Sequence, residues 1–482
     1  MNNLIKNELI KIFNKKSVYI ILLITLAFMI LNSVLSKIFS EDNINNLVNN
    51  KDFYEQQIKN LDQNDPDEKE MYIAFSTQLE ICKIAEKYGM NSWQYQIGKE
   101  KGYDIIENML ASEGTENYDA NKKIYDEFMA KLENDDCMSF IKQELENVNS
   151  QIKELKNSET DGLEIKTLEI SKQALEWRLE KNISYTKSNM NSFISIWEQN
   201  QNTIEQIKDS EKTQSLTYED KYSQKNAEAT AAICRYAIEN NIQDKKALFK
   251  ESECILGTDA DMNLINVFSG YSIFIIILIV VIAGTIISEE FNKGTIKLLL
   301  VRPYKRTKIL VAKFLTCIIM LIFTFLAIGL MQYIISGFTY GFGNFTGDIA
   351  IYNYSSSSVQ TIGLLQYVLL MAVSVMPMFI LLMTLAFALS TIFTNSPIAI
   401  ALPLLGMMGT DIINQLAYNF EKAKFLMYFV TPNWDLSIYL FGKMPQFEPI
   451  SLPFSIMICV IYFVIMVVAS LIIFNKKDIK NI

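Results

Sequence analysis

The feature that most limits the fold of this 482-residue chain is a set of six long apolar segments. Each is a nearly unbroken run of Ile, Leu, Val, Phe and Met, and a transmembrane helix needs roughly 20 such residues. A strand or a buried helix of a soluble protein would not require so many in succession. We therefore expect an all-α membrane protein with six transmembrane helices, at residues 18–35, 264–287, 309–336, 362–389, 397–416 and 454–474.

The charges divide the chain into two chemically different parts. Residues 37–263 carry 27 basic and 44 acidic residues, a net charge of −17, whereas the rest carries 17 basic and 9 acidic residues, a net charge of +8. A soluble acidic insert, residues 36–263, therefore interrupts a basic frame that reads as a membrane protein. The frame comprises residues 18–35 and 264–474, with a short segment at each end, residues 1–17 and 475–482.

The basic residues also predict which side of the membrane each segment occupies. They gather before the first span, in the loop 288–308 between the second and third spans, and in the tail 475–482, whereas residues 337–361 have none. Basic loops are retained in the cytoplasm. We therefore expect a multi-pass protein of the cell membrane, embedded in the lipid bilayer, with both termini cytoplasmic and residues 36–263 extracellular.

The segment 1–17 has a helical pattern of its own. Lys11 and Lys15 lie off a face that carries its apolar residues, Ile5, Leu9, Ile12 and Phe13. Such a pattern predicts a helix that lies in the inner membrane interface before the first span. A frayed basic leader is the alternative.

Residues 36–263 are rich in Lys, Glu, Asn, Gln and Ile, which favours helices. The heptad-like spacing of Ile141, Leu145, Val148, Ile152 and Leu155 predicts a coiled coil, and helical spacing resumes at Leu168 after a break at 157–162. We expect an antiparallel helical hairpin within a large extracellular helical domain. Four cysteines of this segment can form disulfides outside the cell, or remain thiols: Cys82, Cys137, Cys234 and Cys254.

No catalytic or metal site stands out in the sequence. The chain has no His, which removes His-dependent catalysis and the usual zinc ligands, and no pair of carboxylates is distinguishable from a solvated acidic surface. It also lacks the G-x-x-x-x-G-K-[ST] loop that binds nucleotide phosphates. One further polar residue, Asp411, lies late in the fifth span, where it is either an intramembrane polar site or an interfacial residue.

The loop 288–308 carries the most specific pattern. Its sequence with the start of the third span fits E-x-x-x-G-T-x-x-x-L-L-x-x-P-x-x-R-x-x-I-L-x-x-K. This pattern resembles the cytoplasmic loop of ABC-2 type permeases, the transmembrane subunits of bacterial ABC exporters. The resemblance assigns an ATPase-coupling role to Glu289, Glu290, Gly294, Thr295, Leu299, Leu300, Pro303, Arg306 and Lys313.

The resemblance has consequences for function and partners. It implies six spans, an interfacial helix before the first, and a separate ABC ATP-binding subunit that supplies ATP and Mg²⁺, so this chain would be a transport subunit without enzymatic activity. It also implies a second permease chain, identical or a sister, and no nucleic-acid partner. Many family members carry a second acid where this chain has Asn292, and most lack a large first external loop.

The insert between the first two spans makes the chain similar to permeases for antimicrobial peptide efflux or immunity, and more loosely to the phage-infection-protein type. We therefore expect export of a peptide or of an amphipathic or hydrophobic compound, and the charge of the insert fits a cationic peptide. The alternative is a membrane-anchored receptor or sensor whose extracellular helical domain recognises an external ligand.

Overall fold

The computed structural model describes residues 1–41, 46–61, 65–133, 136–157, 162–186, 188–250, 253–296, 304–393, 395–419, 421–445 and 450–477. They form two compact units, one made of Met1–Leu35 with Gly257–Ile482 and the other of Ser36–Leu256. Each unit has its own core and is described by itself. Helices predominate in both, as expected for an all-α membrane protein.

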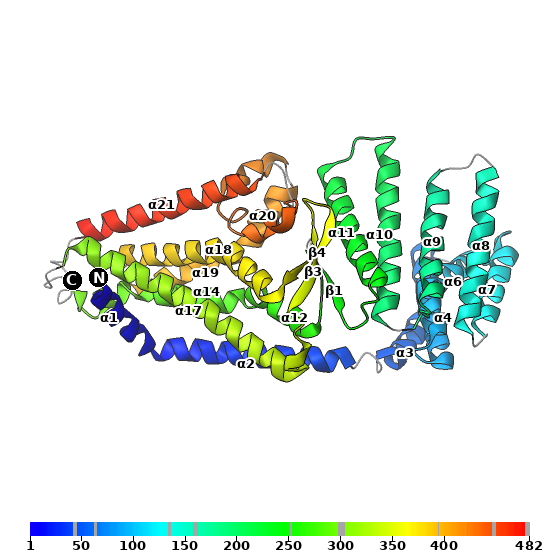
Figure 1. Cartoon of the computed structure of the whole chain (residues 1–482), viewed down its shortest axis with the longest axis horizontal. Helices are drawn as coiled ribbons and strands as arrows, with labels where there is room; N and C mark the ends of the chain where they lie inside the picture. Colours follow the sequence, from blue (N-terminus) through cyan, green and yellow to red (C-terminus); the bar gives the residue numbers. More distant parts are fainter. Residues whose placement is uncertain are drawn as a thin grey trace. The chain divides into compact units, whose positions relative to one another are not determined.

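The first unit is a bundle of apolar helices (Figure 1). Five segments are long and apolar enough to cross a membrane: Lys16–Lys37, Arg306–Tyr340, Leu364–Ile392, Ser396–Leu416 and Leu452–Lys476. They belong to α2 (Lys16–Glu41), α17 (Arg306–Tyr340), α18 (Leu364–Ile392), α19 (Ser396–Met408) with α20 (Thr410–Asn419), and α21 (Leu452–Lys476). These segments coincide with five of the six predicted spans, and the chain is a membrane protein.

The remaining predicted span, residues 264–287, which is the second along the chain, is not one continuous helix. It is divided among α12 (Asp259–Ile265), α13 (Val267–Gly270) and α14 (Ser272–Thr285), and α14 is a shorter apolar helix. The breaks fall at Asn266 and Tyr271, where the backbone leaves the helical conformation. Asn266 favours such a break because its side-chain amide donates to the Met262 carbonyl, 2.9 Å away, and so ends α12.

The first unit also contains a β-hairpin that the sequence analysis did not predict. Strand β3 (Asp348–Asn353) pairs antiparallel with β4 (Ser358–Gly363), with Ile351 opposite Gln360. The turn is stabilised by Asn353, whose side-chain oxygen accepts hydrogen bonds from two backbone amides of the turn. Short 3₁₀ helices complete the unit: η1 (Phe342–Asn344), η2 (Glu421–Tyr428) and η3 (Leu436–Gly442).

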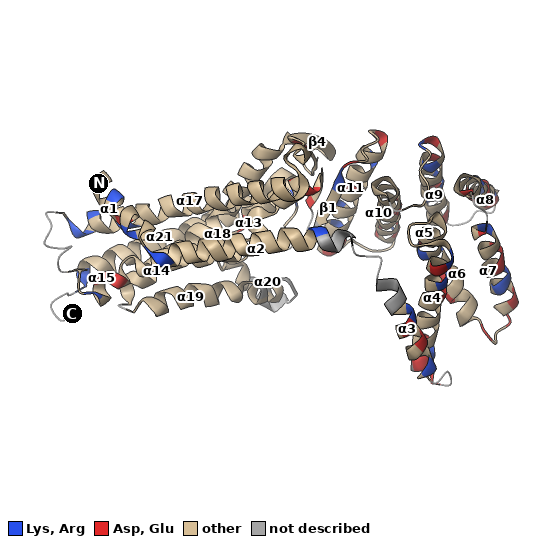
Figure 2. Ribbon diagram, turned by 90° about the horizontal axis from the view of Figure 1, so that it is seen from below, with Lys and Arg blue, Asp and Glu red and all other residues tan. Residues whose placement is uncertain are grey.

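The N-terminal helix lies at the same end of this bundle as the last residues of α21 (Figure 1). Helix α1 (Asn2–Phe13), the predicted helix of the N-terminal segment, packs there against α17, and α21 ends there as well (Figures 1 and 2). Figure 2 shows Lys and Arg of this unit gathered at that end, next to the short helix α15 (Ser288–Asn292).

The second unit consists mainly of helices with a shared core. Its elements are α3 (Asn46–Lys59), α4 (Pro66–Tyr88), α5 (Trp93–Glu100), α6 (Gly102–Ala111), α7 (Tyr118–Leu132), α8 (Cys137–Asn157), α9 (Gly162–Glu180), α10 (Asn189–Glu211), α11 (Tyr218–Glu239), β1 (Lys246–Lys250) and β2 (Glu253–Gly257). Helices α8 and α9 pack against each other, as the heptad spacing predicted. Several aromatic residues of the unit, including Trp93, Trp177 and Trp197, are buried core residues.

The cysteines of the second unit are also buried in its interior. Cys82, Cys137 and Cys234 are thiols, and Cys254 lies 3.5 Å from the Thr230 hydroxyl. Burial raises the pKa of the Cys82 and Cys137 thiols, so these groups stay protonated and unreactive at neutral pH.

Candidate functional site

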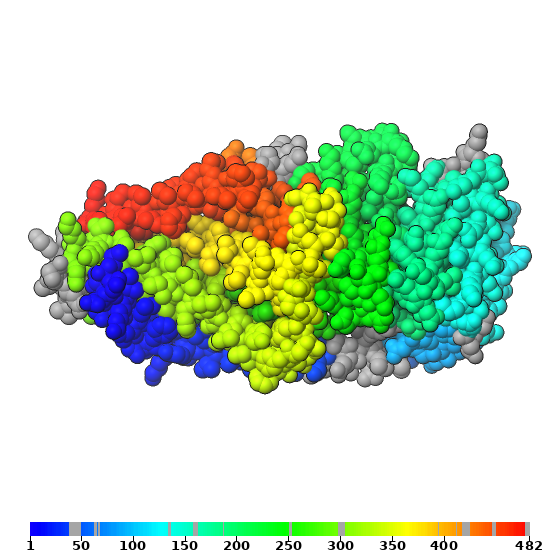
Figure 3. Space-filling view, in the orientation of Figure 1, coloured from blue at the N-terminus to red at the C-terminus, as the bar shows by residue number. Residues whose placement is uncertain are grey.

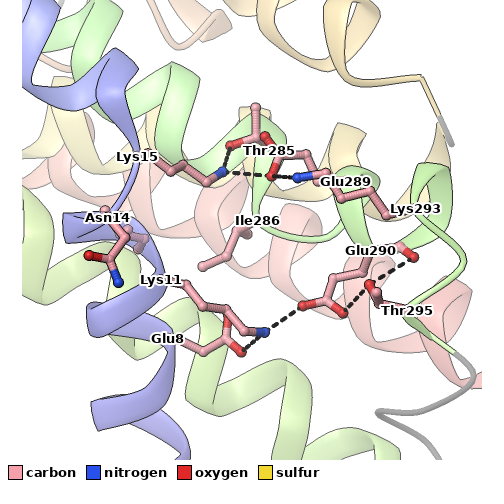
Figure 4. Close-up of a pocket in the computed structure, with 11 residues that line it drawn as sticks. Glu8, Lys11, Asn14, Lys15, Thr285, Ile286, Glu289, Glu290, Lys293 and Thr295 are labelled. Carbon is pink, nitrogen blue, oxygen red and sulfur yellow. Dashed lines mark hydrogen bonds and ion pairs between the residues drawn. The ribbon is translucent and has the colours of Figure 1, made fainter.

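The predicted loop residues meet the N-terminal helix in a cluster of four charged side chains, of which Figure 4 shows Glu8, Lys11 and Glu290. The carboxylate of Glu290, on α15, lies 2.8 Å from the Lys11 ammonium and 3.2 Å from the Lys313 ammonium. Glu8 completes the set, because its carboxylate lies 3.0 Å from Lys11 and 2.7 Å from Lys313. We call Glu8, Lys11, Glu290 and Lys313 the four-charge cluster.

Lys313 is the most deeply buried member of the cluster. Its side chain is 2% exposed, and its ammonium donates to Glu8, to Glu290 and to the backbone carbonyl of Ile286 at 3.0 Å. An ammonium group has three N–H donors, so all of its hydrogen-bonding capacity is used inside the protein. The cluster as a whole holds two positive and two negative charges. Their attraction offsets the desolvation cost of burying this lysine in a bundle of apolar helices.

The pKa of Glu290 reflects this surrounding. Burial by itself raises the pKa of the carboxyl, but the charge of Lys313 and the hydrogen bond from Lys11 outweigh burial and lower it to about 2. Thr295 adds to this effect, since its hydroxyl donates to the second carboxylate oxygen at 3.0 Å. Glu290 is therefore ionised throughout the physiological pH range.

A turn after α15 brings Thr295 back to Glu290. Gly294 has φ +66, a left-handed conformation that costs other residues about 1–2 kcal/mol, and its amide donates to the carbonyl of Phe291 at 3.1 Å. The glycine of the Gly-Thr pair thus reverses the chain, and the threonine then bonds to the carboxylate five residues earlier. Gly294 and Thr295 together hold the turn against the Glu290 carboxylate.

A pocket of about 540 Å³ opens beside the cluster, between α1 and the end of α14 with α15. Glu289 lines it and forms ion pairs with Lys15 at 3.0 Å and with Lys293 at 3.5 Å. Lys15 also donates to the Thr285 hydroxyl at 2.9 Å. These contacts join the N-terminal segment to the loop a second time, one turn from the four-charge cluster (Figure 4).

Helix α15 is connected to other helices of the bundle as well. The Ser288 hydroxyl lies 2.8 Å from that of Ser396, at the start of α19. The Phe291 ring lies under the Lys477 ammonium, 4.3 Å from it, and Lys477 in turn donates to the last carbonyls of α18. A displacement of this five-residue helix would therefore act on α1, α17, α19 and the residue that follows α21.

These residues lie within the part of the chain that matches a known family. The family described as "Protein of unknown function (DUF2705)" matches residues 231–480, slightly more than half of the chain. The chain belongs to this family. The loop, α14 and α17–α21 all fall inside the matched part, whereas Glu8 and Lys11 lie outside it.

Two relatives from Bacillus subtilis (strain 168) are similar to this chain. The "uncharacterized protein YhcI" is 30% identical over 203 residues, which are 42% of this chain and 64% of YhcI, so the match spans less than two thirds of that relative. The "uncharacterized membrane protein YdbK" is 30% identical over 229 residues, 47% of this chain and 87% of YdbK. No solved structure matches the chain.

The structure places the other predicted site residues elsewhere or does not describe them. Arg306 lies at the start of α17, where its guanidinium donates to the carbonyls of Asn475 and Lys477 at 3.1 and 3.2 Å, away from the four-charge cluster. Leu299, Leu300 and Pro303 lie outside the described residues, and so does the side chain of Asp411, which belongs to α20.

Sequence reasoning missed Glu8 and did not predict the partners of Lys11 and Lys15. It placed both lysines off the apolar face of α1, and in the structure both bind the loop carboxylates. A signal was present, because Glu8 is the only acid among the first 40 residues and precedes Lys11 by one helical turn. Within the described residues no cluster of His, Cys, Asp and Glu is arranged to hold a metal ion.

Proposed function

We propose that this chain is the permease subunit of an ATP-driven ABC exporter of the ABC-2 type. Its loop 288–308 would lie in the cytoplasm and would bind a separate ATP-binding subunit, which supplies ATP and Mg²⁺. A second permease chain, identical or a sister, would complete the transport path. A cationic peptide, or another amphipathic compound, would be exported, and residues 36–263 would be extracellular.

One observation supports this proposal more than any other: the loop that resembles the coupling segment is bonded to several helices at once. Glu290 joins α15 to α1 and α17, and Ser288 joins it to α19. A transport subunit driven by a partner needs such a contact point, because movement imposed at one place must change the arrangement of the bundle. The buried pair of Glu290 with Lys313 suits this role, because separating the two groups would leave uncompensated charges in the interior, which is strongly destabilising.

Transport by matched variants tests the proposal. The chain would be co-expressed with the ATP-binding subunit that co-purifies with it, and ATP-dependent export would be measured in membrane vesicles. Glu290→Ala should abolish most of the export, because it removes the link among α1, α15 and α17. Lys476→Ala, a control at an exposed position outside the loop, should keep most of it.

Two results would contradict the proposal. One is normal export by Glu290→Ala at an equal amount of protein in the membrane. The other is the absence of any ATP-hydrolysing polypeptide from the purified complex, which would favour the receptor or sensor alternative.

A further inference from the structure

Four aromatic side chains form a cluster at the end of α17 that is far from Lys313. Tyr333 stacks on Phe345 with ring centres 4.8 Å apart and contacts Phe342 at 5.8 Å, and Phe338 contacts Phe342 at 5.5 Å. The cluster faces outward, since Phe338 is 80%, Phe342 48% and Tyr333 42% exposed. In Figure 3 this end of α17 and the following loop, in yellow-green, stand out on the surface. We call Tyr333, Phe338, Phe342 and Phe345 the aromatic cluster.

The aromatic cluster is exposed, but the loop that carries Phe342 and Phe345 is bonded to the rest of the unit. The Phe342 ring covers Gly337 so closely that a Cβ there would overlap it, so only glycine permits this contact. The loop after the ring is tied to α12: the Thr258 hydroxyl donates to the Asn344 carbonyl at 2.6 Å, and the Thr346 hydroxyl donates to Asp261 at 2.8 Å. A fully buried carboxylate thus fixes a loop that presents apolar rings to the outside.

The surface next to the aromatic cluster indicates what the rings contact. Exposed side chains one turn apart run along α17 toward it: Leu326, Leu330, Ile334 and Phe338. No charged residue occurs at 314–347. An uncharged apolar stripe on a helix long enough to cross a membrane is typical of a lipid-facing surface, and aromatic rings at the end of such a stripe are typical of the boundary between hydrocarbon and headgroups.

The length of α17 agrees with this interpretation. From Lys313 to Phe338 a helix rises roughly 37 Å at 1.5 Å per residue. The hydrocarbon core of a bilayer is about 30 Å thick. With the buried charges at one boundary and a moderate tilt, the rings reach the opposite headgroup region.

We propose that the aromatic cluster anchors the end of α17 in the lipid bilayer, at the headgroup boundary of the leaflet opposite the Lys313 end. Its partner is the lipid surface itself, and the anchor fixes how deep α17 sits. The proposal depends on the chain being a membrane protein and not on the proposed export, so each can fail without the other.

Depth-dependent quenching of tryptophan fluorescence tests the proposal. Phe338→Trp and, as a matched control on the same stripe, Leu326→Trp would be reconstituted in phosphatidylcholine vesicles brominated either near the headgroup or near the chain end. The signal of the parent chain, with its four native tryptophans, would be subtracted. We expect Trp at 338 to be quenched more strongly by the headgroup-proximal bromines, and Trp at 326 by those near the chain end.

Three outcomes would overturn the proposal. If neither bromolipid quenches Trp at 338, the ring is covered by protein or lies in water. If chain-end bromines quench it best, the ring lies in the hydrocarbon core and is no boundary anchor. If both positions show the same depth preference, the stripe does not run along the membrane normal.

Discussion

At Lys313 the chain places an ammonium group among apolar helices, where an unpaired charge would be very costly. Glu8 and Glu290 offset that cost, and Lys11 balances the second carboxylate. Sequence reasoning found Glu290 and Lys313 because both belong to one loop pattern. The sequence singles out Glu8 as the one acid of the N-terminal segment, but it does not give the partner of Glu8, because residues 305 positions apart meet only through the fold.

Removing Lys313 should destabilise the first unit strongly. In Lys313→Ala two buried carboxylates would share one ammonium, and breaking a buried pair in this way costs about 3–5 kcal/mol. Lys305 is the exposed residue directly before α17. Lys305→Ala should therefore change the free energy of unfolding by less than about 0.5 kcal/mol. Denaturant unfolding in detergent measures both, and equal losses in the two variants would contradict the role of the cluster.

The cluster should also make stability depend on pH in the acidic range. The pKa of Glu290 is lowered from 4.5 to about 2 in the folded protein, so its ion pairs contribute fully above pH 4.5. That contribution should be lost as the pH falls from 4.5 toward 2. Unfolding of the wild type and of Glu290→Gln at several pH values tests this: the wild type should lose more stability over that interval, and parallel curves would rule the prediction out.

At the scale of elements, the spans were predictable and the interruptions were not. Long apolar runs identify α2, α17, α18 and α21, because only membrane helices need so many apolar residues. The breaks inside 264–287 depend on single polar side chains such as Asn266, which a hydropathy average hides. The hairpin β3–β4 was not predicted because residues 349–352 are all buried. They lack the alternation of apolar and polar residues that identifies a strand.

The C-terminal end of α18 is bound by Lys477, the residue that follows α21. Lys477 donates to the carbonyls of Thr391 and Ile392, at 2.9 and 3.0 Å, and so caps α18. Lys477→Ala should speed hydrogen exchange at the end of α18 about two- to fivefold, the effect of losing about 0.3–1 kcal/mol of capping. Lys476→Ala, its exposed neighbour, is the control. Exchange that is unchanged in Lys477→Ala would show that this cap adds nothing.

At the scale of the whole molecule, the sequence separated a basic membrane part from an acidic insert, and the structure divides the chain in nearly the same place. The second unit is Ser36–Leu256, and residues 257–263, part of the predicted external domain, pack with the first unit. The reason is Asp261, a charged residue that reads as part of the acidic insert but is buried, where it caps α12 and binds Thr346. Which residues are extracellular stays a prediction.

If the proposed function is right, the second unit is not needed for binding of the ATP-binding subunit. Deleting residues 139–183, the α8–α9 hairpin, should leave binding of the ATP-binding subunit intact, because the residues proposed to couple to it all lie in the first unit. If the acidic unit receives a cationic peptide, resistance to that peptide should be lost. Unchanged resistance, with normal amounts of protein in the membrane, would exclude a role of the hairpin in peptide export.

The central claim of the proposed function is that the loop 288–308 lies in the cytoplasm and contacts a separate ATP-hydrolysing subunit. The most direct measurement is site-specific photo-cross-linking in living cells from position 293, where Lys293 is largely exposed beside Glu289, with mass spectrometry of the products. The account predicts adducts with a polypeptide that carries a G-x-x-x-x-G-K-[ST] loop, and none from position 338 at the far end of α17. Adducts confined to extracellular proteins, or the absence of any nucleotide-binding polypeptide among them, would contradict it.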